Sequence, residues 1–112
     1  MKSKSNEIGK NSSDYALTDM VDYQEGAIVS RTLLKKDNGS VTLFAFDAGE
    51  ELSEHTTPFE ALLVVLDGVA EISIVDKLHK LEPGDVITLP ANQPHAVKPR
   101  QAFKMMLIML GV

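Results

Sequence analysis

Three histidines are the residues of this chain best suited to metal binding or proton transfer. They are His55, His79 and His95, in a sequence of 112 residues that contains no cysteine. Without thiolates, the chain can form no disulfide, thiolate nucleophile, iron–sulfur cluster or thiolate zinc site. Any metal must therefore be held by imidazole, carboxylate, hydroxyl or thioether groups.

The overall charge argues against several classes of partner. Eleven Lys and Arg stand against sixteen Asp and Glu, which gives a formal charge of −5. Nucleic acids and anionic membrane surfaces attract clustered positive charge, so neither is expected as a partner. The N-terminus has no apolar stretch suited to a signal peptide, and no run reaches the roughly 18 apolar residues of a membrane span. The expected location is the cytoplasm.

Short strands are the elements that must position the histidines. Residues 1–13 lack hydrophobic periodicity and are expected to form a flexible tail before one domain at 14–112. Turn residues then recur at spacings that suit strands, with no helix-length amphipathic stretch between them. Hairpin turns are predicted at 37–39 and 67–68. The β-branched and aliphatic segments predict an all-β sandwich or barrel with strands at 27–34, 41–47, 61–66, 70–75, 86–89 and 103–110.

Two of these strands are apolar at nearly every position. They contain Ala61 to Leu66 and Met105 to Leu110. A strand with one wet face should alternate polar and apolar residues, so both faces of these strands are expected to be covered. A monomer of this size has little spare core to cover them, and a second copy of the chain is the simplest cover. The sequence therefore predicts a homodimer.

Two stretches hold His55 and His95 at fixed distances from glycine and proline. GEELSEHTTPFEALLVVLDG covers residues 49–68, and GDVITLPANQPHAVKP covers residues 84–99. In order and internal spacing, they resemble the two conserved motifs of the cupin superfamily. The resemblance implies a double-stranded β-helix, the jelly-roll or RmlC-like cupin barrel, with a pocket inside it.

Only two of the four metal-ligand positions that the resemblance implies are kept. His55 and His95 occupy two of them, whereas Thr57 stands at the second histidine position and Ala61 at the glutamate position. A transition metal needs at least three protein ligands for a firm site, and two neutral imidazoles alone hold it weakly. A His-His-His-Glu site is therefore excluded.

Three kinds of side chain could replace the lost metal ligands: a carboxylate, a hydroxyl and a thioether. Regular strand alternation over residues 55–61 turns Glu60 away from the histidines. Pro58 can accompany a bulge that shifts this phase by one residue and brings Glu60 to them. Thr57 offers a weak oxygen ligand, and Met105 or another methionine of the last strand offers a thioether.

These residues leave three functional hypotheses open. The first is a small-molecule-binding cupin in which His55 and His95 line the pocket together with Thr57, Phe59, Ala61 and Gln93. The alternative is a metal-dependent enzyme, an oxygenase or isomerase, with both histidines as ligands of divalent Zn, Fe, Mn, Ni or Cu. The third is a pH-responsive module in which two histidines near pKa ~6.5 gain charge and repel each other.

The remaining polar candidates have weaker signals. His79 is expected on a solvated edge, without a functional role. Lys98 lies within the second motif, and Arg100 and Lys104 closely follow it; all three could attract an anionic ligand to the pocket mouth.

Overall fold

The computed structural model describes residues 15–111, so the tail predicted at 1–13 lies outside the described residues. A single 3-10 turn, η1 (Leu17–Asp19), precedes the strands of this part of the chain. The strands are β1 (Ile28–Lys36), β2 (Gly39–Phe46), β3 (Leu52–His55), β4 (Glu60–Asp67), β5 (Ala70–Ile74), β6 (Lys77–Leu81), β7 (Val86–Leu89), β8 (His95–Pro99) and β9 (Phe103–Leu110). No helix among residues 15–111 is long and apolar enough to cross a membrane.

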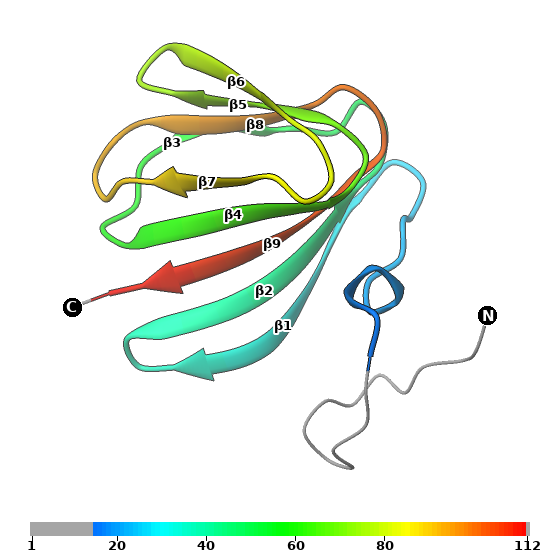
Figure 1. Ribbon diagram of the computed structural model, residues 1–112, viewed down its shortest axis with the longest axis horizontal. Coiled ribbons are helices and arrows are strands. Elements are labelled where there is room, and N and C mark those ends of the chain that lie inside the picture. Colours follow the sequence, from blue (N-terminus) through cyan, green and yellow to red (C-terminus); the bar gives the residue numbers. More distant parts are fainter. Residues whose placement is uncertain (1–14, 112) are drawn as a thin grey trace.

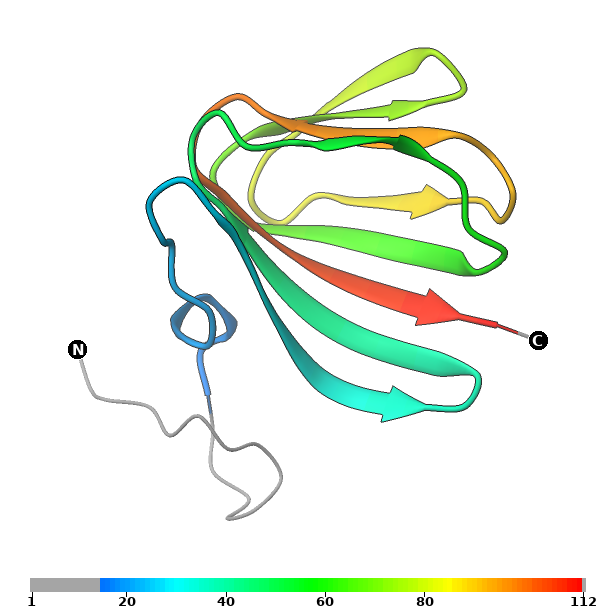
Figure 2. The ribbon, with the colours of Figure 1, turned by 180° about the vertical axis from the view of Figure 1, so that it is seen from behind.

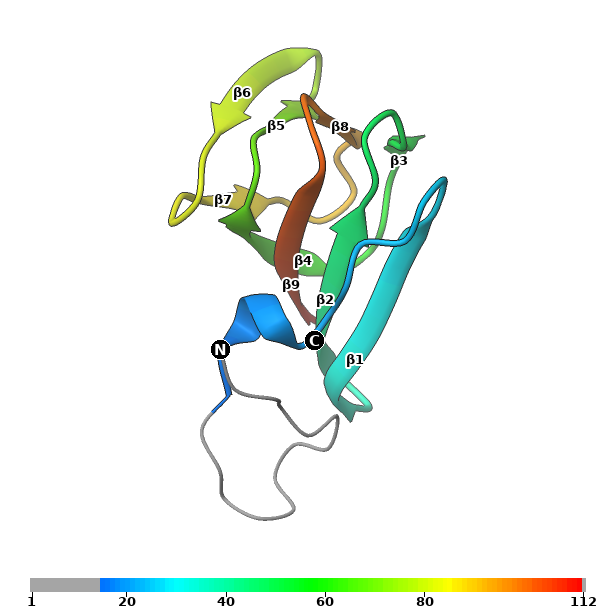
Figure 3. The ribbon, with the colours of Figure 1, turned by 90° about the vertical axis from the view of Figure 1, so that its right-hand side faces the viewer.

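The strands form two antiparallel sheets that face each other (Figures 1 and 3). The larger sheet has the order β1-β2-β9-β4-β7, and the smaller has the order β3-β8-β5-β6. Side chains from both sheets fill the space between them, with Phe46, Leu63 and Phe103 from the larger and Ile72 and Val97 from the smaller. The all-β, jelly-roll fold predicted from the sequence is confirmed.

Each predicted strand lies within two residues of an observed one at both ends. The hairpin turn at Asp37-Asn38 joins β1 to β2 as expected. The hairpin predicted at Asp67-Gly68 is wrong, because β4 and β5 lie in different sheets and the chain crosses between the sheets there. Gly68 nevertheless has the positive φ, 78°, that was expected of this turn.

The outer face of the larger sheet is partly covered by the chain's own residues 15–23 (Figure 3). Met20 and Val21 pack there against Leu43 and Ala45 of β2. The ammonium group of Lys104 donates a hydrogen bond to the carbonyl of Thr18 at 2.6 Å and lies 4.9 Å from the centre of the Tyr23 ring. This segment covers only part of the face, and large apolar side chains remain exposed beside it, namely Leu34, Leu62, Val86 and Leu110.

The connections next to His55 and His95 lie at one end of the barrel, which we call the mouth end (Figure 2). The loop at 56–59 joins β3 to β4, and the loop at 90–94 joins β7 to β8. The turn between β1 and β2 and the end of β9 lie at the same end. The fold therefore brings both histidines to the mouth end.

Candidate functional site

His55 and His95 lie side by side on neighbouring strands of the smaller sheet. His55 is the last residue of β3, His95 is the first of β8, and the two are directly opposed in the antiparallel register. Their ring centroids are 4.4 Å apart, with the rings inclined at 67°. Forty residues apart in sequence, the two histidines thus form one pair at the mouth end.

Local hydrogen bonds fix the same tautomer in both rings. Nδ1 of His55 lies 2.8 Å from the carbonyl oxygen of Ser53, and Nδ1 of His95 lies 3.2 Å from that of Gln93. A carbonyl oxygen only accepts, so each Nδ1 donates, and Nε2 of each neutral ring carries the lone pair. Each Nε2 is therefore an acceptor or a ligand atom, and a backbone bond fixes this tautomer.

The surroundings of the pair favour the neutral form of His95. This side chain is 5% exposed, whereas His55 is exposed at the edge strand. Burial lowers the pKa of His95 below its usual 6.5, the carbonyl of Gln93 partly opposes this, and the neighbouring His55 lowers the pKa further. At neutral pH, His95 therefore presents its Nε2 lone pair rather than a positive charge.

Thr57 uses its hydroxyl to shape the loop between β3 and β4. Its Oγ1 accepts a hydrogen bond from the backbone N–H of Phe59 at 3.1 Å, and its carbonyl accepts one from Asn92 at 2.8 Å. The second bond ties the two motif loops together. The chain forms a loop at 56–59, so neither a regular strand through residues 55–61 nor a bulge at Pro58 sets the direction of Glu60.

The other predicted ligands lie apart from the histidines. Ala61, Leu63 and Val65 of β4 point into the core, so Glu60 belongs to the opposite, outer face and is exposed. A bulge that would turn Glu60 inward is absent from β4 at this point, since its pairing with β9 is regular from Glu60 to Val65. Met105 is buried in the core between the sheets. The suggestion that Glu60 replaces a lost metal ligand is therefore wrong.

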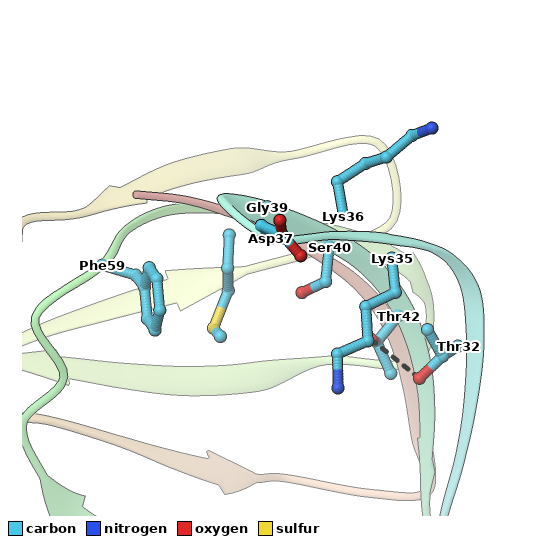
Figure 4. Close-up of a pocket in the computed structure, with 9 residues that line it drawn as sticks. Thr32, Lys35, Lys36, Asp37, Gly39, Ser40, Thr42 and Phe59 are labelled. Carbon is cyan, nitrogen blue, oxygen red and sulfur yellow. Dashed lines mark hydrogen bonds between the residues drawn. The ribbon is translucent and has the colours of Figure 1, made fainter. Parts of the chain in front are cut away.

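The residues predicted to line one pocket with the histidines do not lie together. Ala61 is buried in the core. Gln93 is exposed, and its backbone carbonyl accepts the hydrogen bond from Nδ1 of His95. Phe59 instead lines a cavity of about 340 Å³ on the inner face of the larger sheet (Figure 4). Met109, one of the methionines of the last strand, lines it too, but most of its lining comes from residues that the sequence did not indicate, among them Thr32, Lys35, Ser40 and Thr42.

Two of the three cations expected near the mouth are used elsewhere, and the third, Lys98, is exposed on β8. Arg100 pairs with Glu71 at 2.8 Å, and Lys104 is buried beneath residues 15–23. His79 also differs from expectation. It lies on an edge strand as predicted, but it is half-buried opposite Ile72, while Leu78 is the exposed neighbour.

The sequence matches the family model described as Cupin domain over residues 42–111. The chain belongs to the cupin family. This cupin shares 30% identity with a conserved protein of unknown function from Streptococcus pyogenes, at a TM-score of 0.88 over 100% of this chain and 96% of that one. It shares 31% identity with a cupin superfamily protein from Desulfitobacterium hafniense, at a TM-score of 0.86 over 90% and 93% of the two chains.

A cupin 2 conserved barrel domain protein from Leptotrichia buccalis is also similar, with 41% identity and a TM-score of 0.82. The match covers 86% of this chain and 47% of that one. No curated protein matches the chain significantly. The similar structures therefore support the family and the fold. An activity for this cupin has to be argued from its own residues.

The residues of this cupin do not fit the metal site that its family often carries. Within residues 15–111, no three His, Cys, Asp or Glu side chains gather closely enough to hold an ion. The two Nε2 atoms of the histidine pair are suitable donors, but Thr57 and Ala61 supply neither the missing imidazole nor the missing carboxylate. A metal would need water or a bound small molecule for its other ligands, which makes a weak and exchangeable site.

Proposed function

We propose that this cupin binds a small molecule at the mouth end of its barrel, with His55 and His95 as the recognising pair. The observation that carries the proposal is the matched hydrogen bonding of the two rings. Each is anchored through Nδ1 to a carbonyl two residues earlier, and each keeps an Nε2 lone pair for a ligand donor. Paired acceptors suit a ligand with two hydroxyl or amide N–H donors.

A fragment screen by ligand-observed NMR tests this proposal. The probes are a set of small neutral alcohols, diols and amides, and the variants are His55→Ala, His95→Ala and His79→Ala. Fragments that bind the wild type should lose binding in the first two variants and keep it in His79→Ala, the matched control. If no fragment binds, or if all three variants bind as the wild type does, the proposal is wrong.

The alternative proposal is a metal-dependent enzyme, an oxygenase or isomerase, with His55 and His95 as ligands. The free Nε2 atoms are the observation that favours it. Elemental analysis of untagged protein, purified without chelators, distinguishes the two proposals. One equivalent of Zn, Fe, Mn, Ni or Cu that both His→Ala variants lose would support the enzyme. Metal-free protein whose affinity for added Zn²⁺ is unchanged by His55→Ala would remove its chemical basis.

We propose that a second copy of the chain covers the exposed outer face of the larger sheet. Leu62 of β4 and Leu110 of β9 are exposed there, beyond the part that residues 15–23 cover. One row of the register carries Lys36 at the β1 edge and Glu60 on β4. A two-fold axis along the strands, between β2 and β9, would place Lys36 of one copy over Glu60 of the other. Apolar area and opposite charges make this face self-complementary.

The cytoplasmic location stays a prediction. Its support is that the sequence contains no cysteine.

A further inference from the structure

The inner face of the β1–β2 hairpin changes character toward the mouth end. Deep in the barrel, its inward side chains are Phe44 and Phe46, which pack into the core. Toward the turn, Thr42 and then Ser40 follow on the same face of β2, and Thr32 lies opposite Thr42 with the two hydroxyl oxygens 3.4 Å apart. Hydroxyl groups thus replace hydrocarbon where the barrel opens.

A bulge brings one lysine to the same face. The β1–β2 register shifts between Thr32 and Leu34, so the alternation reverses and Lys35 lies opposite Ser40 on the inner side. Lys35 makes no hydrogen bond or ion pair with any residue among 15–111. The neighbouring Lys36 also borders the cavity, but its ammonium group points away from it (Figure 4). One ammonium group is therefore available to a ligand.

Two apolar side chains also line the cavity of about 340 Å³. Phe59 lies opposite the hydroxyl groups (Figure 4), and Met109 of β9 is the register neighbour of Ser40. The ring of Phe59 packs against Gly111 so closely that an added Cβ would lie 2.7 Å from it. Asp37 in the hairpin turn is the carboxylate at the rim. The cavity thus combines a cation, hydroxyl donors and a carbon-rich wall, as small-molecule sites commonly do.

We propose that this cavity binds a small monocarboxylate with an apolar body. Lys35 pairs with the carboxylate, the hydroxyls of Ser40 and Thr42 donate hydrogen bonds to it, and the body lies against Phe59 and Met109. A single inward ammonium with Asp37 nearby suits one negative charge better than two. Neither histidine lines this cavity, so the inference goes beyond the histidine site proposed above.

Benzoate and its neutral analogue benzamide are the probes that test it, followed by ¹H–¹⁵N and methionine-methyl NMR of the full chain. Benzoate should shift the signals of Thr32, Ser40, Thr42 and Met109, and benzamide should bind about tenfold more weakly. Lys35→Met keeps the aliphatic stem and should weaken benzoate binding about tenfold. Lys80→Met is the control, because Lys80 is exposed on β6 of the other sheet and does not line the cavity, and this variant should bind benzoate as the wild type does.

Three results would overturn the proposal. Benzoate and benzamide could bind equally, the two lysine variants could behave alike, or the shifts could map away from the hairpin. A fourth variant separates this site from the histidine pair, because His55→Ala should retain benzoate binding. Loss of benzoate binding in a folded His55→Ala variant would contradict a separate carboxylate site.

Discussion

Burial of one imidazole ring should make the stability of this protein depend on pH. Folding lowers the pKa of His95 below its usual 6.5, chiefly through burial. A group with a depressed folded pKa stabilises the fold fully above its unfolded pKa, and that stability is lost as pH falls through the folded value. We expect the free energy of unfolding of metal-free protein to fall as pH drops below about 6.5.

Urea denaturation at a series of pH values measures this effect. His95→Gln should flatten the decline below about pH 6.5. His79→Gln, the matched control, should keep the wild-type slope. An identical slope in His95→Gln and wild type would show that His95 does not titrate differently in the folded and unfolded chains.

The positions of single residues were only partly predictable from sequence. Motif spacing predicted that His55 and His95 line one pocket, and their rings lie side by side in the structure. Lys35 could not be found, because a bulge in β1 reverses the strand alternation and the apolar pattern does not reveal the bulge. The placement of Glu60 depended on whether residues 55–61 form a regular strand or a bulge at Pro58, and neither pattern revealed the loop that lies at 56–59.

At the scale of elements, a strained turn between β5 and β6 offers a stabilising substitution. Val75 and Asp76 both have positive φ, 47° and 65°, in a two-residue turn. This conformation costs roughly 1–2 kcal/mol for most L-residues, and asparagine tolerates it best. Val75→Asn should stabilise the protein by about 1 kcal/mol, since the side chain is 53% exposed and packs little.

Thermal or urea unfolding checks this gain. Val86→Asn is the control, because Val86 is similarly exposed, at 55%, but lies in the extended strand β7. That control should bring no stabilisation, because asparagine is disfavoured in strands. A Val75→Asn variant no more stable than wild type would contradict the strain in this turn.

The crossing from one sheet to the other requires glycine at position 68. Gly68 has φ +78°, and an added Cβ would lie within 3 Å of backbone atoms of Ala102 and Phe103. Gly49 has φ +91° with nothing within 4 Å. Gly49→Ala should cost about 1 kcal/mol from backbone strain, and Gly68→Ala about 3 kcal/mol or more, because overpacking adds to the strain. Equal losses in urea denaturation would contradict the close approach.

Composition explains which elements could be predicted. The six apolar runs became β1, β2, β4, β5, β7 and β9, each within two residues of the predicted ends. The strands not predicted, β3, β6 and β8, are short and rich in charged residues, histidine or proline. They lie in the smaller sheet, where pairing with neighbours, not their own apolar pattern, makes them strands. The turn at Val75-Asp76 also lacked the usual glycine signal.

At the scale of the whole molecule, the exposed outer face predicts the oligomeric state. Light scattering after size exclusion should give the wild type a mass about twice that of the 12.2 kDa chain. Leu62→Lys places a charge on that face and should give a monomer. Leu78→Lys is the matched control, because Leu78 is exposed on β6 of the other sheet, and it should remain a dimer. A monomeric wild type would contradict the proposed dimer.

Long-range ¹H–¹⁵N NMR of the imidazole nitrogens tests the central proposal most directly, because it reports which nitrogen of each ring carries the proton and which responds to a ligand. We predict Nδ1–H tautomers for both His55 and His95 at neutral pH. A bound fragment should then move both of their Nε2 resonances and leave those of His79 in place. Protonated Nε2 atoms in the free protein, or Nε2 resonances that do not respond to any binding fragment, would contradict a recognising histidine pair at the mouth of this cupin.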